Sequence, residues 1–160
     1  MESGALEKSE AADCGPRLAL PAWARQPRVW LAGWWVWFGV LFILSSIPGH
    51  EMPDQPFRFF DKIEHTGYFF GGSGLLGGWL ILTGRWPARR WLLPLAAAAV
   101  GAFDEIHQLF TPGRSSGVDD WIADVLGGFL ALAAIRWVAV RKLLAPPSPP
   151  LVPGTPVAQE

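Results

Sequence analysis

The chain has 160 residues, of which 51% are hydrophobic and 17% are charged, and its 13 basic and 14 acidic side chains give a net charge of −1. This length allows one small domain rather than two. The single cysteine, Cys14, excludes an intramolecular disulfide framework.

Four apolar runs dominate the sequence, at residues 29–47, 65–82, 91–110 and 121–140. The first is about 19 residues long and uncharged, close to the roughly 20 residues that a helix needs to cross a bilayer. A soluble bundle alternates apolar and charged faces, whereas these runs are apolar all round for most of their length. We therefore predict an all-α fold, a four-span transmembrane helix bundle with short loops.

The predicted membrane domain occupies residues 29–142 and lies between two polar segments. Residues 1–28 form an N-terminal arm that mixes charge with Ala, Gly and Pro, and residues 143–160 form a proline-rich tail. Neither segment has a hydrophobic period. Residues 1–26 are therefore expected to be poorly ordered, and residues 145–160 to be disordered or polyproline-like. The first run is expected to stay in the protein, because it exceeds the roughly 7 to 15 apolar residues of a signal peptide.

Basic residues indicate the orientation in the membrane. They precede the first run, separate the second from the third and follow the fourth, whereas the opposite loops at residues 48–64 and 111–120 contain only Arg58, Lys62 and Arg114. By the positive-inside rule, both termini are cytoplasmic and these two loops face outward. Nucleic-acid binding is not expected, since the basic residues lie along the inner membrane surface.

The second run begins with polar residues and continues with glycines. A helix that starts near Asp61 carries Asp61, His65 and Tyr68 on one face, at positions i, i+4 and i+7. Glycines between Gly67 and Gly78 recur at a spacing that lets another helix approach closely. This pattern favours packing within one bundle, and a homo-oligomer interface has the same pattern.

Polar residues also gather where the third run ends and the fourth begins. Asp104 and Gln108 are spaced i, i+4 and Glu105 lies three residues before Gln108, so these groups share a stripe. Asp120 and Asp124 open the fourth helix, where the helix dipole favours carboxylates. A charge at the centre of a spanning helix costs about 2.5 to 3.5 kcal/mol, so these groups need partners or a water-filled pocket. We predict one pocket at the outward ends of the helices.

Three kinds of role fit such a pocket. Lys62 and Arg114 can pair with the carboxylates and fix the loops, which is a purely structural role. The pocket can instead bind a cationic, amide or sugar group. Catalysis could use Glu105 as a general base and His65 as a proton shuttle, but no nucleophile elbow is present and an enzyme is not favoured.

A metal site is a further alternative. His65 with Asp104, Glu105, Asp120 and Asp124 forms an oxygen-rich set that suits calcium, magnesium or manganese better than zinc. Because the sequence has no ligand-spacing motif, we predict no metal and no cofactor.

Three motifs together resemble the VanZ-like membrane proteins: DKIEH at 61–65, DEIHQLFTPGR at 104–114 and DDWIADVLGG at 119–128. The family pattern is Asp-Lys-x-x-His, then Asp-Glu-x-x-Gln running into Pro-Gly-Arg, then Asp-x-x-x-Asn/Asp before a glycine. The resemblance covers residues 45–140, and Asp124 stands where asparagine is commonest. Carried over by position, it implies a ligand-binding set of Asp61, Lys62, His65, Asp104, Glu105, Gln108, Arg114, Asp120 and Asp124.

The resemblance implies a small multi-span protein of the bacterial cytoplasmic membrane, and one family member is associated with low-level resistance to the glycopeptide teicoplanin. We predict that the outward acidic pocket binds a cell-envelope component and affects glycopeptide susceptibility. Lys62 and Arg114 are expected to hold the pocket in shape, and the expected contacts to the ligand come from Asp104, Glu105, Gln108 and Asp120.

Two alternatives remain beside this prediction. One is a membrane enzyme that acts on a lipid or lipid-linked substrate through Glu105 and His65. The other is an assembly partner that contacts a membrane protein, or a second copy of itself, through the glycine-rich face at residues 67–78. Membrane lipids are expected neighbours in every case.

Overall fold

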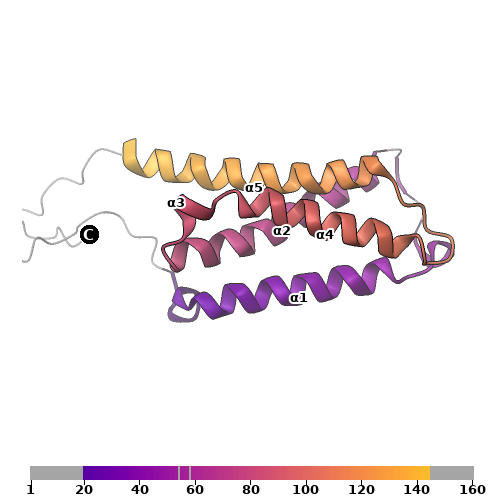
Figure 1. Cartoon of the computed structure of the whole chain (residues 1–160), viewed down its shortest axis with the longest axis horizontal. Helices are drawn as coiled ribbons and strands as arrows, with labels where there is room; N and C mark the ends of the chain where they lie inside the picture. Colours follow the sequence, from indigo (N-terminus) through magenta and orange to yellow (C-terminus); the bar gives the residue numbers. More distant parts are fainter. Residues whose placement is uncertain (1–19, 54, 58, 145–160) are drawn as a thin grey trace, which may run out of the picture.

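The structure is a computed structural model that describes residues 20–53, 55–57 and 59–144, with side chains as far as residue 139. Within these residues every regular element is helical, which confirms the predicted all-α class. Four long helices run side by side (Figure 1): α1 (Pro27–Ser45), α2 (Phe60–Leu82), α4 (Leu92–Gln108) and α5 (Val118–Leu144). Three short helices complete the fold: η1 (Ala22–Arg25), η2 (Gly49–Glu51) and α3 (Trp86–Arg89).

Proline and glycine set several helix boundaries. Pro27 opens α1, at a position where a missing backbone donor does no harm. Gly84 follows α2 with a φ of 68°, and Gly113 turns the chain between α4 and α5 with a φ of 72°. Both values lie in the left-handed region that glycine adopts without steric cost.

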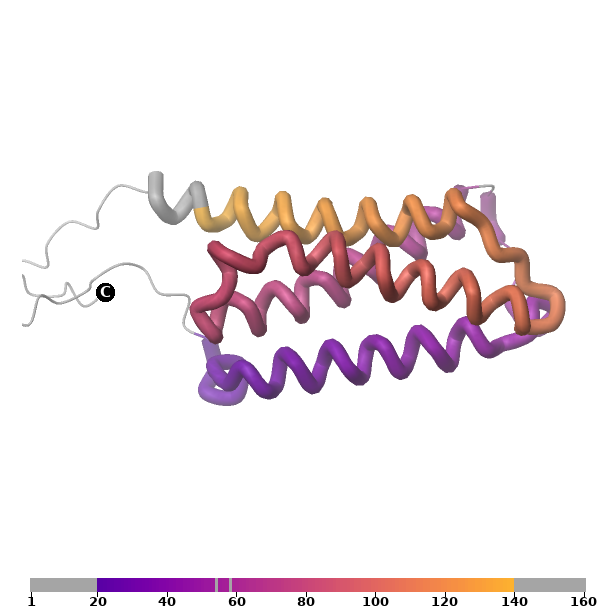
Figure 2. The backbone as a smooth tube through the Cα atoms, viewed as in Figure 1, coloured from indigo at the N-terminus to yellow at the C-terminus, as the bar shows by residue number. Residues whose placement is uncertain are grey.

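The packing order places α1 and α5 on opposite sides of α2 and α4 (Figure 2). The most extensive helix contact joins α2 to α5, followed by α4 to α5 and then α1 to α2. Two buried apolar clusters fill the interior, one around Leu80 and Leu93 and the other around Phe69. Helices α2 and α5 approach closely at Gly127 of α5, where an added Cβ would lie 2.8 Å from the backbone nitrogen of Phe70 in α2.

The glycines of α2 divide into two groups. Gly72 packs against Trp37, and Gly77 packs against Leu93 and Ile135, so these two positions serve the bundle as predicted. In contrast, a Cβ added at Gly67, Gly71 or Gly74 would meet nothing within 4 Å. Contact with a second copy through these open positions stays a prediction.

The prediction of four spans is not reproduced in full. Within the described residues, only Pro27–Ser45 and Val118–Ala139 are long and apolar enough to count as membrane spans. The other two long helices fall short for physical reasons: α4 has 17 residues, and α2 combines a charged first turn with many glycines. Only 11% of the apolar window of the first candidate span is buried, whereas the core helix of a soluble protein is mostly buried.

Part of the N-terminal arm is helical. Residues 1–26 were expected to be poorly ordered, yet η1 forms at Ala22–Arg25, directly before α1 begins at Pro27. The indole nitrogen of Trp30 donates a 2.8 Å hydrogen bond to the carbonyl oxygen of Ala24, which fastens this turn to α1. The predicted disorder of residues 1–19 and of the tail from residue 145 concerns residues outside those that the structure describes.

Candidate functional site

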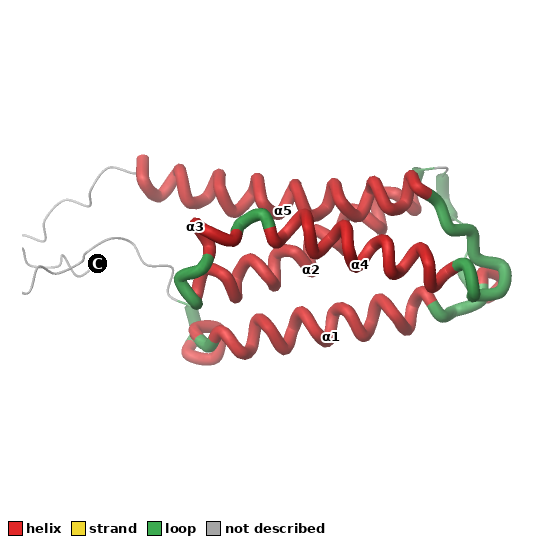
Figure 3. The backbone as a smooth tube through the Cα atoms, viewed as in Figure 1, coloured by secondary structure: helices red, strands yellow, loops and turns green. Residues whose placement is uncertain are grey.

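The polar groups converge on one end of the bundle, as the sequence predicted. The C-terminal ends of α1 and α4 meet the N-terminal ends of α2 and α5 there, joined by the loops on the right of Figure 3. Five of the described arginines lie at the opposite end of the bundle: Arg25 in η1, Arg28 at the start of α1, and Arg85, Arg89 and Arg90 in and around α3. Charge is therefore segregated along the bundle axis.

Lys62 connects α2 to α5 at this end. Its ammonium nitrogen lies 3.1 Å from Asp61 Oδ2 and 2.9 Å from Asp119 Oδ2, and it donates a hydrogen bond to Asp120 Oδ1. The Asp120 side chain is only 10% exposed, whereas that of Asp119 is 71% exposed. One cation thus faces three carboxylates, in agreement with the scaffold role expected of Lys62.

His65 lies one helical turn deeper and also joins α2 to α5. Its Nδ1 is 2.9 Å from Asp124 Oδ1, and Asp124 is fully buried. On the other side of the ring, Nε2 lies 3.7 Å from Asp61 Oδ1 and 3.9 Å from Asp120 Oδ1. The ring is thus oriented by carboxylates on both edges.

Asp104 connects α4 to α1. Its carboxylate accepts hydrogen bonds from the Ser45 hydroxyl and from Gln108 Nε2, the latter at 2.9 Å, which confirms that Asp104 and Gln108 share a helix face. The Thr111 hydroxyl closes the arrangement by donating to the carbonyl oxygen of Ser45 at 3.1 Å. Ser45, Asp104, Gln108 and Thr111 are all buried, and their hydrogen bonds connect α1 to α4 at the polar end of the bundle.

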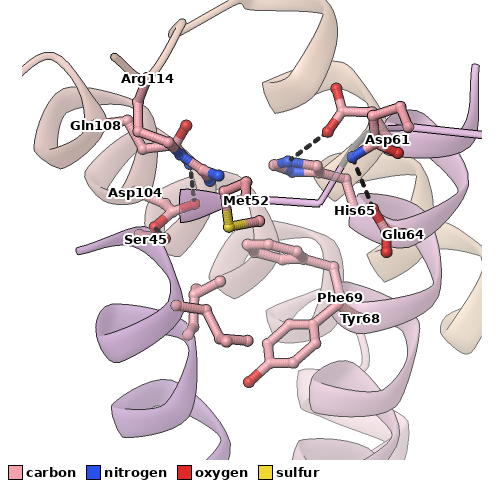
Figure 4. Close-up of a pocket in the computed structure, with 13 residues that line it drawn as sticks. Ser45, Met52, Asp61, Glu64, His65, Tyr68, Phe69, Asp104, Gln108 and Arg114 are labelled. Atoms are coloured by element: carbon pink, nitrogen blue, oxygen red, sulfur yellow. Dashed lines mark hydrogen bonds and ion pairs between the residues drawn. The ribbon is translucent and has the colours of Figure 1, made fainter. Parts of the chain in front are cut away.

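A cavity of about 260 Å³ opens between α1, α2 and α4 (Figure 4). Its polar lining contains three carboxylates, one imidazole and one guanidinium, from Asp61, Glu64, Asp104, His65 and Arg114. Its apolar lining comes from Leu41, Leu44, Met52, Tyr68 and Phe69. The cavity is therefore amphipathic, with an acidic excess in its polar part.

The structure divides the predicted binding set into two groups. Five members line the cavity, namely Asp61, His65, Asp104, Gln108 and Arg114. The other four do not: Lys62 and Asp120 pair with each other, Asp124 pairs with His65, and Glu105 accepts a 2.7 Å hydrogen bond from the backbone nitrogen of Gly117. Two of the four expected ligand contacts, Glu105 and Asp120, thus lie outside this cavity.

Arg114 differs from the expectation that it pairs with a carboxylate. It reaches the cavity from the α4–α5 loop (Figure 4), yet none of the described acidic residues forms an ion pair with it. Its guanidinium presents donors that suit a phosphate or carboxylate. Arg114 thus lines the cavity while its guanidinium has no acidic partner among the described residues.

Sequence reasoning gave no role at this site to Ser45, Thr111 or Trp37. Ser45 and Thr111 hold Asp104 in place, and the only signal was their position at the ends of apolar runs. The Tyr68 hydroxyl donates a 2.8 Å hydrogen bond to the carbonyl oxygen of Trp37, and the Trp37 indole donates one of 3.1 Å to the carbonyl oxygen of Tyr68. This reciprocal pair forms part of the α1–α2 contact beside the cavity.

An all-helical bundle with two helices long and apolar enough to cross a membrane, and a carboxylate-rich site at one end, is typical of a small helical membrane protein. The chain matches the model of the VanZ/LLP1 family over residues 29–139 and belongs to that family. No individually curated protein and no solved structure shows significant similarity to it.

Proposed function

We propose that this chain is a four-span protein of the bacterial cytoplasmic membrane that binds a lipid-linked component of the cell envelope. In this proposal both termini are cytoplasmic and the polar end of the bundle faces outward, in accord with the distribution of basic residues. The α2 and α4 helices cross the membrane between α1 and α5 (Figure 2), with apolar side chains such as Leu95 and Ile81 exposed to lipid.

Exposed apolar side chains support the membrane location. On α1, the side chains of Val36 and Ile43 are 66% and 64% exposed, and on α5 Ile122 is 56% exposed. Such residues are unfavourable in water over the length of two helices but suit contact with acyl chains.

The observation that carries the binding proposal is the amphipathic lining of the cavity. Phe69 and Leu41 are buried and offer an apolar wall for a lipid chain, while Gln55 and Glu64 are exposed at the polar side. Sugar and amide groups both donate and accept hydrogen bonds, so they match this mixture of carboxylates and amides. Arg114 adds a donor for the phosphate of a lipid link.

Native mass spectrometry of the purified protein in detergent tests the proposal. The first probe is a polyprenyl diphosphate that carries a disaccharide. The second probe is phosphatidylglycerol, a lipid without the sugar. We expect the saccharide lipid to bind preferentially, and Arg114→Gln to weaken it about tenfold or more, because a hydrogen bond to a charged group contributes about 1.5 to 3 kcal/mol.

Arg89→Gln is the matched control, since Arg89 is an exposed arginine at the opposite end of the bundle. Equal binding of the two lipids, or equal binding by wild type and Arg114→Gln, contradicts the proposal. With binding established, deletion of the protein in its host is expected to change teicoplanin susceptibility, as the family resemblance implies.

A membrane enzyme acting on the same class of lipid is the second candidate. The observation in its favour is His65, which lines the cavity while Asp124 fixes the orientation of its ring through a 2.9 Å contact. A histidine held in this way can transfer a proton to or from a bound substrate. Incubation of the saccharide lipid with wild type and His65→Gln distinguishes the candidates, because only an enzyme consumes the lipid.

A further inference from the structure

Two buried side chains and one partly buried side chain, from three different helices, meet beneath the polar surface. His65 comes from α2, Glu105 from α4 and Asp124 from α5, and one potential ligand atom from each lies within 4.8 Å of the others. Glu105 is 7% exposed and Asp124 is fully buried, so both carboxylates have left bulk water.

Two carboxylate oxygens in this group have no hydrogen-bond partner among the described residues, Glu105 Oε1 and Asp124 Oδ2. A buried, unpartnered carboxylate oxygen is costly, because it has lost its hydration without compensation. The other oxygens are used, Glu105 Oε2 by the Gly117 amide and Asp124 Oδ1 by His65. Each carboxylate therefore has one free acceptor in the interior.

No described lysine or arginine forms an ion pair with Glu105 or Asp124. The nearby group of Asp61, His65 and Asp120 also has ligand-like spacing, but the Lys62 ammonium already contacts both of its carboxylates. The deeper group has only His65 to balance two acidic side chains, and the missing positive charge indicates a cation.

Although the sequence alone led us to expect no metal, we propose that His65, Glu105 and Asp124 bind a divalent transition-metal ion, zinc or manganese. One imidazole with two carboxylates is a donor set that these ions accept. Ligand atoms about 2.1 Å from one ion lie about 3.0 to 3.4 Å apart, so small side-chain rotations convert the observed spacing into a site. This metal site is additional to the proposed envelope ligand, and binding of the ion does not depend on that ligand.

The surroundings of His65 fit this role. Its Nδ1 lies 2.9 Å from Asp124 Oδ1, and a bound ion would replace the proton that these two atoms share. Its Nε2 faces Asp61 and Asp120 at 3.7 and 3.9 Å. Histidine ligands of metals usually direct their second nitrogen toward a carboxylate, which fixes the ring and raises its basicity.

Access to the site exists from two sides. His65 lines the amphipathic cavity, and Glu105 lines a second cavity of about 230 Å³ between α4 and the start of α5, together with Ser116 and Trp121. Three protein ligands leave coordination positions for water or a ligand from either cavity. A bound ion thus connects α2, α4 and α5 at the end of the bundle where the polar loops lie.

The test uses untagged, full-length protein in detergent, stripped with a chelator and titrated with Zn²⁺ or Mn²⁺ alone. Equilibrium dialysis with elemental analysis is expected to give one ion per chain. Glu105→Gln and Asp124→Asn are each expected to lower the affinity about 10- to 100-fold or more, since even outer-shell partners contribute that much. Asp119→Asn is the matched control, because this carboxylate is exposed and outside the triad.

A measurement on Mn²⁺-loaded protein avoids dependence on those variants. Electron spin echo spectroscopy is expected to detect an imidazole nitrogen coupled to the ion, and the coupling is expected to persist when both other histidines, His50 and His107, are replaced by Gln. If neither Zn²⁺ nor Mn²⁺ binds at one ion per chain, the proposal is overturned. Loss of the nitrogen coupling in that double variant, or unchanged affinity in folded Glu105→Gln, also overturns it.

Discussion

Replacement of Lys62 by Met tests how the polar end is held together. The ammonium contacts carboxylates on both α2 and α5, and its removal leaves Asp120, 10% exposed, with only the His65 ring at 3.9 Å as a potential cationic neighbour. Loss of one member of a buried ion pair costs about 3 to 5 kcal/mol. Because Lys62 and Asp61 are 28% and 40% exposed, solvent screens part of the effect, and we expect a loss of about 2 to 3 kcal/mol.

Denaturant unfolding in mixed detergent micelles, followed by circular dichroism, measures this change in the free energy of unfolding. A double-mutant cycle with Asp120→Asn isolates the interaction, because the uncompensated charge disappears in the double variant. We expect a coupling energy of about 1 kcal/mol or more. Asp119→Asn is the control, and its change is expected to be much smaller than that of Lys62→Met because that carboxylate is 71% exposed.

A Lys62→Met protein as stable as wild type refutes this reasoning. So does a double variant whose destabilisation equals the sum of the two single changes, since additive effects mean that Lys62 and Asp120 act independently. In either case the carboxylates are stabilised by something other than this lysine.

Three further predictions concern packing and hydrogen bonds. Gly128→Ala places a Cβ 2.9 Å from Pro94 Cα and should lower the free energy of unfolding by about 1 to 3 kcal/mol. Gly71→Ala is the control at an open position, and it should leave the midpoint of thermal unfolding unchanged or raise it. Tyr68→Phe removes the hydrogen bond to Trp37 and should cost about 1 kcal/mol in the same assay; no change would show that the bond contributes nothing. Asp104→Asn should weaken the tie between α1 and α4 by about 1 to 3 kcal/mol and increase proteolysis of the loop after α1; unchanged proteolysis would contradict this role.

The sequence predicted the fold class and the location of the site, because both depend on local patterns. Apolar runs of helical length indicated four long helices, and the i, i+4 spacing of Asp104 and Gln108 indicated a shared face that the structure confirms. The charge bias predicted that carboxylates from several helices meet at one end. Each of these inferences needs only residue spacing along a helix.

The partners of individual side chains could not be predicted in this way. They depend on how far each helix is rotated about its axis, which sets whether Glu105 faces the cavity or Gly117. The pairing of Arg114 with a carboxylate was expected from charge alone, but the loop geometry leaves its guanidinium without an acidic partner among the described residues. The two-span result arises from composition, since glycine-rich α2 packs well but is weakly apolar.

The most direct test of the central claim, an outward-facing polar end, is the accessibility of single cysteines in a Cys14→Ser background. Ser115 lies in the exposed α4–α5 loop beside the site, and Ala88 is exposed in α3 at the opposite end. Intact cells are treated with a membrane-impermeant thiol reagent, and permeabilised cells show that both cysteines can react. The account predicts labelling at position 115 alone in intact cells. Labelling at position 88 alone contradicts it, because the acidic cavity then faces the cytoplasm and cannot bind an external envelope component.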